Sequence, residues 1–438
     1  MLSESIIIWS LVLLLMLILV IPYLIKVRRK QALDYKKKKE AELVGADKPI
    51  AQYPQIDYFR CIGCGACVDA CPEGGILGIV SGKATIINGL KCVGHGLCAE
   101  ACPVNGIKVG LGDIKSRDDI PVLSSSNETN IPGIYIAGEL TGLALIKNAI
   151  SQGKKVMDEI AKKEKNKLEK DVLDVIIIGA GPAGLSAALT AIDHKINFLI
   201  LDQQAAGGTI LQYPRKKIVM TRPVEIPLYG WLKKNEYSKE ELLEIWQSIQ
   251  NRFPVNVKIN EKLENIKKMN GVFHVFTQKS IYKSKYIVLA LGRRGTPRKL
   301  NIPGENQSKV MYKLMDAETY QNENILIIGG GDSAVEAAMG LARNSKNSVT
   351  ISYRKPKFFR IKSRNEERIY KMIEDKKVNV LFNSTITEIG KDNVKIKQDH
   401  KVFTLPNSYV FIFAGGEPPF PLMKNIGIKF GGELEPSV

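Results

Sequence analysis

The chain has 438 residues, which is enough for two to three domains that each bury their own core. Its formal net charge is +18, but the lysines are spread among glutamates, and no basic patch interleaved with aromatic residues occurs. We therefore expect no nucleic-acid partner and ascribe the charge to a lysine-rich proteome or to a membrane surface. All seven cysteines lie between Cys61 and Cys102. This confinement indicates a metal site in a reducing compartment rather than a disulfide framework.

The N-terminal segment is apolar and long enough to cross a membrane. Residues 6–25 form an apolar run that is interrupted only by Ser10, Pro22 and Tyr23. About 20 apolar residues span a bilayer. Only Glu4 is charged before them, whereas basic residues follow directly, an order opposite to that of a cleavable signal. The sequence predicts a single-pass anchor in residues 1–27, with the N-terminus outside and the rest cytoplasmic, followed by a charged helical stalk in residues 28–49. A buried helix of a soluble protein is the alternative.

Two cysteine runs of identical spacing come next. Residues 61–72 read CIGCGACVDACP, and residues 92–103 read CVGHGLCAEACP. The first is the C-x2-C-x2-C-x3-C-P pattern of bacterial iron–sulfur proteins, in which three thiolates surround one cluster and the fourth ligates another. Zinc is the alternative for any cysteine cluster, and two such runs in tandem disfavour it.

These runs resemble the two-cluster bacterial ferredoxins, which implies a small α+β ferredoxin domain over residues 50–111. By that resemblance, one [4Fe–4S] cluster is held by four cysteines: Cys61, Cys64, Cys67 and Cys102. The other cluster is held by three: Cys71, Cys92 and Cys98. His95 occupies the remaining position, as a fourth iron ligand, as the mark of a three-iron cluster, or as a neighbour of some other ligand. As a ligand it would raise the cluster potential and make it depend on pH, because imidazole lacks the thiolate's negative charge.

A strand, turn and helix typical of a dinucleotide site begin near residue 171. Residues 175–178 are apolar and lead into GAGPAG and a helix of small residues, and a second strand over 196–201 ends at Asp202. The glycines allow a tight turn and bring a pyrophosphate to the helix N-terminus, and the carboxylate binds ribose hydroxyls. A glycine-rich turn in some other α/β protein is the alternative. The expected cofactor contacts belong to the turn, the carboxylate and a downstream loop: Gly179, Gly181, Pro182, Ala183, Gly184, Asp202, Gly207, Gly208, Thr209, Gln212 and Tyr213.

The same pattern recurs after a helix predicted over residues 239–252 and three predicted strands: residues 255–259, 272–277 and 285–291. Residues 324–328 form a strand that leads into GGGDSA, and a later strand over 349–352 ends in basic residues. An acidic residue there favours NAD, so the basic residues favour NADPH, a solvated basic loop being the alternative. The expected contacts are Gly329, Gly331, Asp332, Ser333, Ala334, Arg354, Lys355 and Arg360.

Two such units with LALGRRGTPRKLNIPGE between them resemble the thioredoxin reductase family over residues 171 to about 430. The resemblance implies an α/β fold of two Rossmann-like domains, with FAD in the first, Gly292 among its contacts, and NADP(H) in the second. It divides this part of the chain into an FAD domain, an NAD(P) domain and a return to the FAD domain: residues 112–305, 306–408 and 409–438. Arg360 lies one residue farther along than in the family, and Lys355 replaces an arginine, which weakens a bidentate phosphate contact.

The closing segment of that family is found upstream in this chain. Family members end with a segment like TNxPGIYAAGD and a helix, whereas here TNIPGIYIAGE occupies residues 129–139 and a helical pattern follows over 143–161. The resemblance therefore implies a circular permutation, with residues 112–165 as the displaced end of the FAD domain and residues 162–170 as a new linker. Gly138 and Glu139 would lie beside the flavin, Glu139 in place of the usual aspartate. A degenerate partial duplication is the alternative.

No cysteine follows Cys102, so the CxxC pair of thioredoxin reductases is absent and dithiol chemistry on the protein is excluded. The resemblance leaves hydride transfer from nicotinamide to FAD, with single electrons passed on to the clusters and no catalytic side chain. Three functions stay open. One is electron transfer in either direction between NADPH and a redox partner such as a ferredoxin, a quinone or a membrane complex. The second is reduction of a small disulfide, since GGTILQYPRKKIVMTRP resembles bacillithiol disulfide reductases; the third is a subunit of a larger complex. We also expect a homodimer.

Overall fold

The computed structural model describes residues 2–49, 51–163, 171–343 and 346–433. It divides into two compact units, Met1–Gly110 and Leu111–Val438. Most of the linker expected over residues 162–170 lies outside the described residues.

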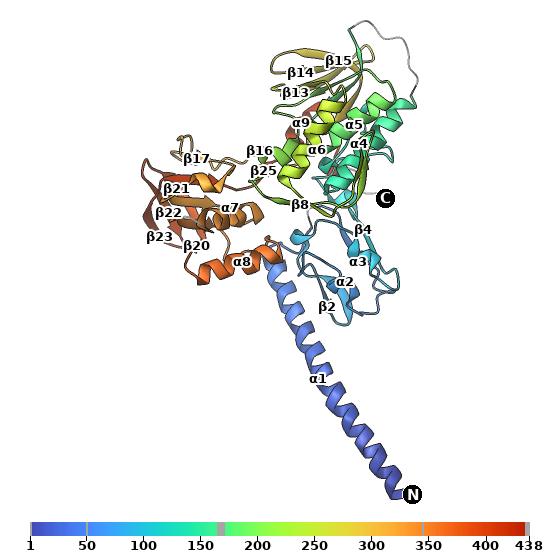
Figure 1. Ribbon diagram of the computed structural model, residues 1–438, viewed down its shortest axis with the longest axis vertical. Coiled ribbons are helices and arrows are strands. Elements are labelled where there is room, and N and C mark those ends of the chain that lie inside the picture. Colours follow the sequence, from blue (N-terminus) through green and yellow to red (C-terminus); the bar gives the residue numbers. More distant parts are fainter. Residues whose placement is uncertain (1, 50, 164–170, 344–345, 434–438) are drawn as a thin grey trace. The chain divides into compact units, whose positions relative to one another are not determined.

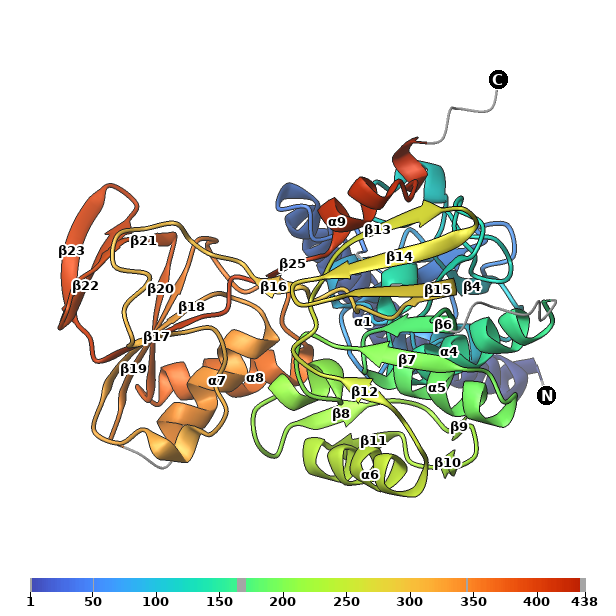
Figure 2. The same cartoon turned by 90° about the horizontal axis from the view of Figure 1, so that it is seen from above.

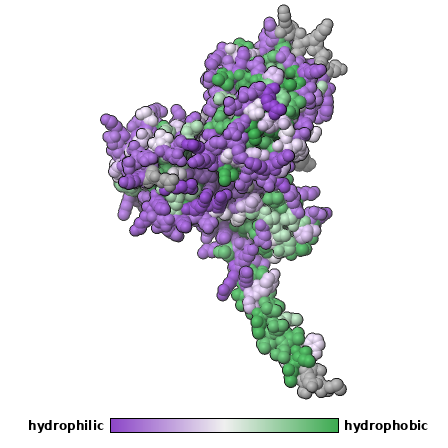
Figure 3. Space-filling view, viewed as in Figure 1, coloured by the Kyte–Doolittle hydropathy of each residue, from purple (hydrophilic) through white to green (hydrophobic). Residues whose placement is uncertain are grey.

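The first unit begins with one long helix. Helix α1 (Leu2–Leu43) continues without a break from the apolar segment into the basic residues that follow it (Figure 1). The face of its N-terminal half that Figure 3 shows is apolar. The helix is long and apolar enough to cross a membrane, with no part of the apolar window buried. The same length and composition also occur in signal sequences. The segment expected to be a separate stalk is thus, up to Leu43, the second half of the same helix.

The rest of the first unit is a small α+β body that carries all the cysteines. Two antiparallel strand pairs and two short helices form it: β1 (Tyr53–Ile56) with β4 (Ile107–Gly110), β2 (Leu77–Val80) with β3 (Lys83–Ile86), α2 (Ala66–Asp69) and α3 (Leu97–Glu100). Each helix follows a glycine with positive φ, Gly65 at 84° and Gly96 at 87°, a conformation that glycine adopts without strain. The two cysteine runs therefore fold as two similar local structures.

The first sheet of the second unit has seven strands, in the order β12-β7-β6-β15-β14-β13 with β5 also paired to β15 (Figure 2). Its strands are β5 (Ile134–Ile136), β6 (Leu173–Ile178), β7 (Phe198–Leu201), β12 (Val257–Lys258), β13 (Leu263–Met269), β14 (Val272–Thr277) and β15 (Ile281–Leu289). β6 pairs in parallel with β7 and β15, and β5 pairs in parallel with the second half of β15. The upstream segment is therefore built into this sheet.

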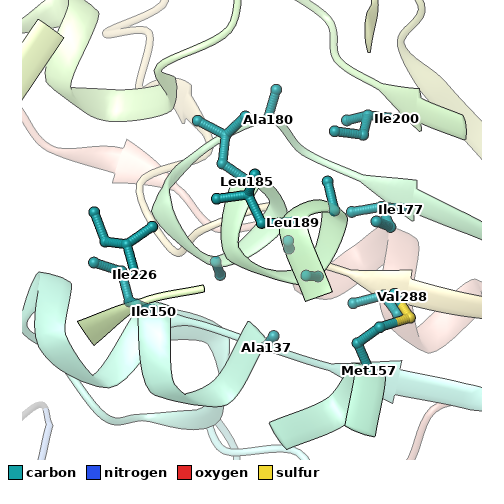
Figure 4. Packing of buried hydrophobic residues seen from close by; sticks show 14 of the residues in the cluster. Ala137, Ile150, Met157, Ile177, Ala180, Leu185, Leu189, Ile200, Ile226 and Val288 are labelled. Atoms are coloured by element: carbon teal, nitrogen blue, oxygen red, sulfur yellow. The ribbon is translucent and has the colours of Figure 1, made fainter. Parts of the chain in front are cut away.

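Two helices from distant parts of the sequence pack together on this sheet. They are α4 (Ile146–Ala161), from the upstream segment, and α5 (Pro182–Asp193), which follows β6. The Ser186 hydroxyl donates to the Ile150 carbonyl oxygen at 2.7 Å. A Cβ on Gly153 would lie 2.1 Å from the carbonyl oxygen of Ala183, so the two backbones touch. Figure 4 shows Ile150 and Met157 in one apolar cluster with Leu185 and Leu189.

Short strand pairs and a further helix complete this part. The strands are β8 (Ile218–Met220) with β11 (Glu236–Ser238) and β9 (Val224–Ile226) with β10 (Gly230–Leu232). Helix α6 (Lys239–Arg252) begins at a capping box, in which Ser238 and Glu241 each bond the other's backbone N–H. Its Trp246 is buried in the same core as α4 and α5.

The second sheet is parallel, with the strand order β17-β24-β18-β19-β20. Its strands are β17 (Val310–Met311), β18 (Asn324–Ile328), β19 (Ser348–Tyr353), β20 (Val378–Phe382) and β24 (Tyr409–Ile412), and its helices are α7 (Asp332–Arg343) and α8 (Ser363–Glu374). A three-stranded antiparallel sheet lies beside it, made of β21 (Ser384–Ile389), β22 (Asn393–Gln398) and β23 (Lys401–Pro406). The parallel sheet and the three-stranded sheet together are formed by residues that follow β15 of the first sheet in the sequence.

The chain then returns to the first sheet. The strands β16 (Thr296–Pro297) and β25 (Gly416–Glu417) pair where the chain leaves the first sheet and comes back to it. Helix α9 (Phe420–Ile426) follows. Its Met423, together with Ile428 and Phe430 just after the helix, is buried in the core of the first sheet. The second nucleotide-type sheet is thus inserted into the first.

The contact at Gly153 predicts a destabilising substitution. Gly153→Ala forces the methyl group into the Ala183 carbonyl, so we expect a loss of about 1–3 kcal/mol of unfolding free energy and a lower melting temperature. The control is Gly340→Ala, an exposed glycine in α7 whose added Cβ meets nothing closer than 3.4 Å. That change should leave stability unchanged or raise it by about 0.5–1 kcal/mol. Equal melting temperatures for the two variants would contradict the packing.

Candidate functional site

The first glycine turn has the geometry of a dinucleotide site. Gly179 has φ of 111° at the end of β6, and a Cβ there would lie 2.3 Å from the Ala290 carbonyl oxygen. A Cβ on Gly184 would lie 1.8 Å from the Gly179 carbonyl oxygen, so strand and helix approach as closely as glycine permits. By contrast, the nearest atom to a Cβ on Gly181 is 3.8 Å away. The N-terminus of α5 is thus open on the side where a pyrophosphate would bind.

Asp202 directly follows β7 and faces this turn. Its Oδ2 accepts a hydrogen bond from the Ala180 N–H at 2.7 Å, and its Oδ1 accepts one from the Gln204 N–H at 2.7 Å. Burial raises the pKa of Asp202, and these two N–H groups act in the opposite direction. Each carboxylate oxygen keeps a further lone pair for another donor. The carboxylate therefore suits the hydroxyls of a ribose.

The loop after Asp202 passes beside the same turn. The Gly207 N–H donates to the Ala180 carbonyl oxygen at 2.9 Å, and a Cβ on Gly208 would lie 2.9 Å from the Cα of Gly181. Burial raises the pKa of Tyr213. The other predicted loop residues lie in the 3-10 turn Gly208–Gln212: Thr209 and Gln212.

The upstream segment meets the turn at Gly138. This residue follows β5 with φ of 90°, and its N–H donates to Gln152 Oε1 of α4 at 2.7 Å. A Cβ on Gly138 would lie 3.2 Å from the Cβ of Ala183, which follows Pro182 in the first turn of α5. Residues that are far apart in sequence therefore surround one helix N-terminus.

Glu139 projects from the upstream segment toward the loop after β15. The residue is exposed to solvent, but the protein atoms around its carboxyl group partly desolvate it and so raise its pKa. The Arg293 N–H and the charges of Arg293 and Arg294 oppose this rise. Gly292, with φ of 66°, precedes these arginines. The structure thus brings together the sequence-predicted Glu139 and Gly292.

A partly buried group of ion pairs near this loop was not predicted. Asp119 Oδ1 accepts a hydrogen bond from Arg117 Nε at 2.7 Å, and Asp119 Oδ2 contacts Arg293 Nη2. Burial would raise the pKa of Asp119, but the two guanidinium groups hold it below its usual value. Asp119 and Arg293 are 174 residues apart, so no local motif indicates the contact.

The second glycine turn follows β18. Gly329 has φ of 143°, and no atom lies within 4 Å of a Cβ on Gly331, so the N-terminus of α7 is also open. Asp332 Oδ1 accepts hydrogen bonds from the Lys362 N–H at 3.0 Å and from Asn365 Nδ2 at 2.7 Å, which joins α7 to the start of α8. The first turn of α7 holds the two remaining predicted contacts, Ser333 and Ala334.

The predicted basic residues gather around Tyr353, the last residue of β19. Burial raises the pKa of Tyr353, and the charges of Arg360 and Arg354 oppose the rise. Both arginines are exposed and available to a ligand. Lys355 is half-buried, and its carbonyl oxygen accepts a hydrogen bond from the Asn383 N–H at 3.2 Å.

In the first unit, a cavity is lined by the four cysteines expected to share a cluster: Cys61, Cys64, Cys67 and Cys102. It is partly open to solvent. The Ala84 N–H points at Cys61 Sγ at 3.4 Å, and the Gly106 N–H points at Cys102 Sγ at 3.2 Å. Burial, and then the neighbouring thiols, raise the pKa of the Cys67 thiol to about 11. These residues fit an iron–sulfur cluster that binds thiolates and accepts N–H···S bonds.

In the described part of the chain, no three or more His, Cys, Asp or Glu side chains are placed to hold a single metal ion. Tetrahedral zinc requires ligands about 2.0–2.3 Å from one point.

The second set of cysteines also gathers. Burial raises the pKa of the Cys98 thiol to about 11, and the nearby Cys71 and Cys92 raise it further. His95 lies in the interior, with its side chain 8% exposed and its Nε2 3.8 Å from Oε1 of Glu73, which is 4% exposed. Glu73 also raises the pKa of Cys92, so this buried carboxylate, two residues after Cys71, belongs to the same site. Sequence reasoning did not single it out.

Comparisons with known proteins match both units. Residues 176–438 match the family model of pyridine nucleotide-disulphide oxidoreductases, and residues 53–103 match that of 4Fe-4S dicluster domains. The chain is 32% identical over 279 residues to a 34.2 kDa protein in the rubredoxin operon of Clostridium pasteurianum, covering 61% of this chain and 84% of that protein. It is 28% identical over 265 residues to a ferredoxin–NADP reductase of Ignicoccus hospitalis, covering 59% and 83%. A solved bacillithiol disulfide reductase from Staphylococcus aureus has 26% identity and a TM-score of 0.53, covering 59% of this chain and 81% of that one.

The Asp202 carboxylate predicts a change in flavin content. Asp202→Asn removes the charge while keeping the shape, so we expect FAD to bind about 10- to 100-fold more weakly, because charged hydrogen bonds contribute about 1.5–3 kcal/mol. Titration of apoprotein with FAD measures the effect. The control is Asp174→Asn, whose Oδ2 accepts the Asn197 N–H at 3.0 Å near the start of β6. Equal FAD affinities in the two variants would count against the assignment.

The His95 position predicts a spectroscopic change. His95→Cys completes the second C-x2-C-x2-C-x3-C-P run, and the added thiolate should lower the potential of this cluster. A three-iron cluster would instead become a four-iron cluster, which electron paramagnetic resonance distinguishes. If neither the potential nor the cluster type changes, His95 does not reach the iron. His95→Ala provides the matched variant without a ligand atom.

Proposed function

The chain belongs to the pyridine nucleotide-disulphide oxidoreductase family, and on that premise we propose a membrane-anchored enzyme that passes electrons between NADPH, FAD, two [4Fe–4S] clusters and a redox partner. It is an FAD-dependent pyridine nucleotide oxidoreductase with a 4Fe-4S domain. The cysteine-lined cavity carries the electron-transfer proposal, because a reductase acting only on small molecules needs no cluster.

Bound FAD would accept a hydride from nicotinamide and release single electrons to the clusters. The chain's residues bind and orient these groups. The turn at residues 179–184 and Asp202 would hold the adenosine and pyrophosphate, and Gly138 and Glu139 would approach the ribityl chain. Arg354 and Arg360 would bind the 2′-phosphate that distinguishes NADPH from NADH. No side-chain acid or base is required.

We propose that the FAD domain is circularly permuted. The family match begins at residue 176, while β5 pairs with β15 and α4 packs on α5. In addition, Asn130 Nδ2 donates to the Gly427 carbonyl oxygen at 2.9 Å, and Asn130 Oδ1 accepts the Lys429 N–H at 2.8 Å. The upstream segment therefore contacts residues 427–429, near the end of the described chain, which supports one continuous ancestral segment that was cut and moved.

The anchor proposal is supported by α1 and by the charge order around it. The apolar half is long enough to span a bilayer, and the basic residues after it favour the cytoplasmic side. Both units would then face the cytoplasm. A partner in or near the membrane would exchange electrons with the clusters.

A second candidate is an NADPH-dependent reductase of a low-molecular-weight disulfide. It is favoured by the likeness to a bacillithiol disulfide reductase and by the absence of any cysteine after Cys102 in the sequence. On that account the disulfide would react at the flavin. Such an enzyme would need neither the clusters nor the anchor.

A cluster-deficient variant separates the two candidates. The double variant Cys61→Ser, Cys64→Ser should still bleach its flavin with NADPH, but reduction of a one-electron acceptor protein should fall at least about 10-fold. Full FAD content, equal to that of the unmodified chain, is the control for folding. If bacillithiol disulfide is reduced rapidly and equally by both proteins, while the one-electron acceptor is reduced slowly by both, the small-molecule candidate is correct.

The basic residues near Tyr353 predict the nucleotide preference. Arg354→Ala together with Arg360→Ala should raise KM for NADPH about 10- to 100-fold and change KM for NADH little, because only NADPH carries the 2′-phosphate. Steady-state kinetics with both nucleotides measure this. The control Lys397→Ala removes an exposed positive charge from β22. An equal rise in KM for both nucleotides would contradict the assignment.

A further inference from the structure

One face of α1 is packed against the cysteine-bearing body. Along the basic half of the helix, the residues that are wholly or partly buried include Val27, Gln31, Asp34, Lys38 and Ala41, a spacing of three and four that follows one face. Asp34 Oδ2 accepts a hydrogen bond from the Ile79 N–H of β2 at 3.0 Å. Lys30 Nζ lies 4.0 Å from Asp69 of α2. The helix therefore contacts this body along one face rather than only at its C-terminal end.

The register of this contact fixes the height of the body above a membrane. The apolar segment ends at Ile25, and the contact face begins two residues later at Val27. With a rise of about 1.5 Å per residue, Val27 lies about 3 Å and Asp34 about 13 Å beyond Ile25. The headgroup layer is about 5–7 Å thick on each side of a bilayer. If α1 spans the membrane as proposed, the body rests at the lipid surface.

The hairpin of β2 and β3 shows which end of the body faces the lipid. Beyond the hairpin, the Leu90 N–H donates to the Ala46 carbonyl oxygen at 3.1 Å, past the C-terminal end of α1. Farther down the helix, β2 contacts Asp34 through Ile79. The hairpin therefore runs along α1 toward the apolar half, and its turn at residues 81–82 is its membrane-side end.

The first cysteine loop sits on that turn. Lys83 Nζ donates to the Cys61 carbonyl oxygen at 2.6 Å, and a Cβ on Gly63 would lie 2.0 Å from the Gly82 carbonyl oxygen. The cavity lined by Cys61 is thus at the membrane-side end of the body. The second cysteine run begins at Cys92, next to Leu90, and so lies toward the opposite end.

The loop presents large apolar side chains to solvent. Phe59 is 101% exposed, Ile62 64% and Tyr58 53%. Asp57 Oδ1 accepts hydrogen bonds from the N–H groups of Phe59, at 2.9 Å, and of Arg60, so the turn that projects Phe59 outward is held in place. Such side chains favour the interface between lipid and water.

We propose that residues 58–62 insert into the headgroup layer of the cytoplasmic leaflet, and that the cluster of Cys61, Cys64, Cys67 and Cys102 is the one that exchanges electrons at the membrane. The proposal rests on the membrane anchor proposed above. The basic residues of α1 at the same level, Lys26, Arg28, Arg29 and Lys30, favour anionic lipid there. The redox partner is then membrane-soluble or membrane-embedded, because Cys64 is exposed and lies just beyond residues 58–62 in the chain.

Photocrosslinking of the full chain tests this arrangement. The purified protein, with p-benzoylphenylalanine at one position at a time, is placed in nanodiscs of phosphatidylcholine and phosphatidylglycerol, irradiated and analysed by mass spectrometry. The positions are Phe59, Leu19 in the apolar half of α1, and Leu43, which is 86% exposed at the far end of α1. A lipid adduct is expected at Phe59 and Leu19 and not at Leu43.

The outcomes separate the two proposals. Adducts at Leu19 but none at Phe59, or only protein adducts at Phe59, leave the anchor intact and overturn the lipid contact of the loop. Adducts at Leu43 as well as Phe59 show that lipid reaches both ends of the body, which overturns the assignment of the first cysteine loop as the membrane-side end. No adduct at Leu19 rejects the anchor itself and the loop contact with it. Iron content and cluster absorbance equal to those of the unmodified chain confirm that each protein is folded.

Discussion

The close approach of backbones around the N-terminus of α5 is the constraint on which the second unit depends. Gly184 packs against Gly179, and Gly153 of α4 packs against the carbonyl of Ala183. Gly138 meets the same helix from β5. A Cβ at Gly184 or Gly153 would collide with backbone, and Gly138 has a positive φ that favours glycine, so three chain segments meet closely at this helix end. A dinucleotide site here therefore requires the upstream segment as much as the glycine turn itself.

The first unit depends on its cysteines in a similar way. Residue Cys67 is 5% exposed and belongs to an apolar cluster of only a few buried residues, including Ile76 and Ala84. A body of this size buries too little apolar surface to be very stable alone, and bound clusters add folding free energy. The contact of Asp34 with β2 adds a second support from α1. Cluster binding, folding and the position of the body on the helix are therefore linked.

Local features of the fold and site could be predicted from the sequence, and contacts between distant residues could not. The glycine turns before α5 and α7 follow from short motifs, and the helix expected over residues 239–252 is α6. The strand expected over residues 255–259 is reduced to β12, because only Val257 and Lys258 pair with β7. Asp119 with Arg293 and Glu73 with His95 have no local signature, since each pair is brought together only by the tertiary fold.

The central claim is that electrons pass within one chain between the nucleotide, the flavin and the clusters. An anaerobic titration of the purified chain with NADPH, followed by flavin absorbance and low-temperature electron paramagnetic resonance, tests it most directly. One flavin and two one-electron clusters take about four electrons, so the account predicts reduced-cluster signals and an endpoint of about two NADPH per chain. An endpoint of about one NADPH, with the flavin bleached and both clusters still oxidised until dithionite is added, would contradict transfer from NADPH to the clusters.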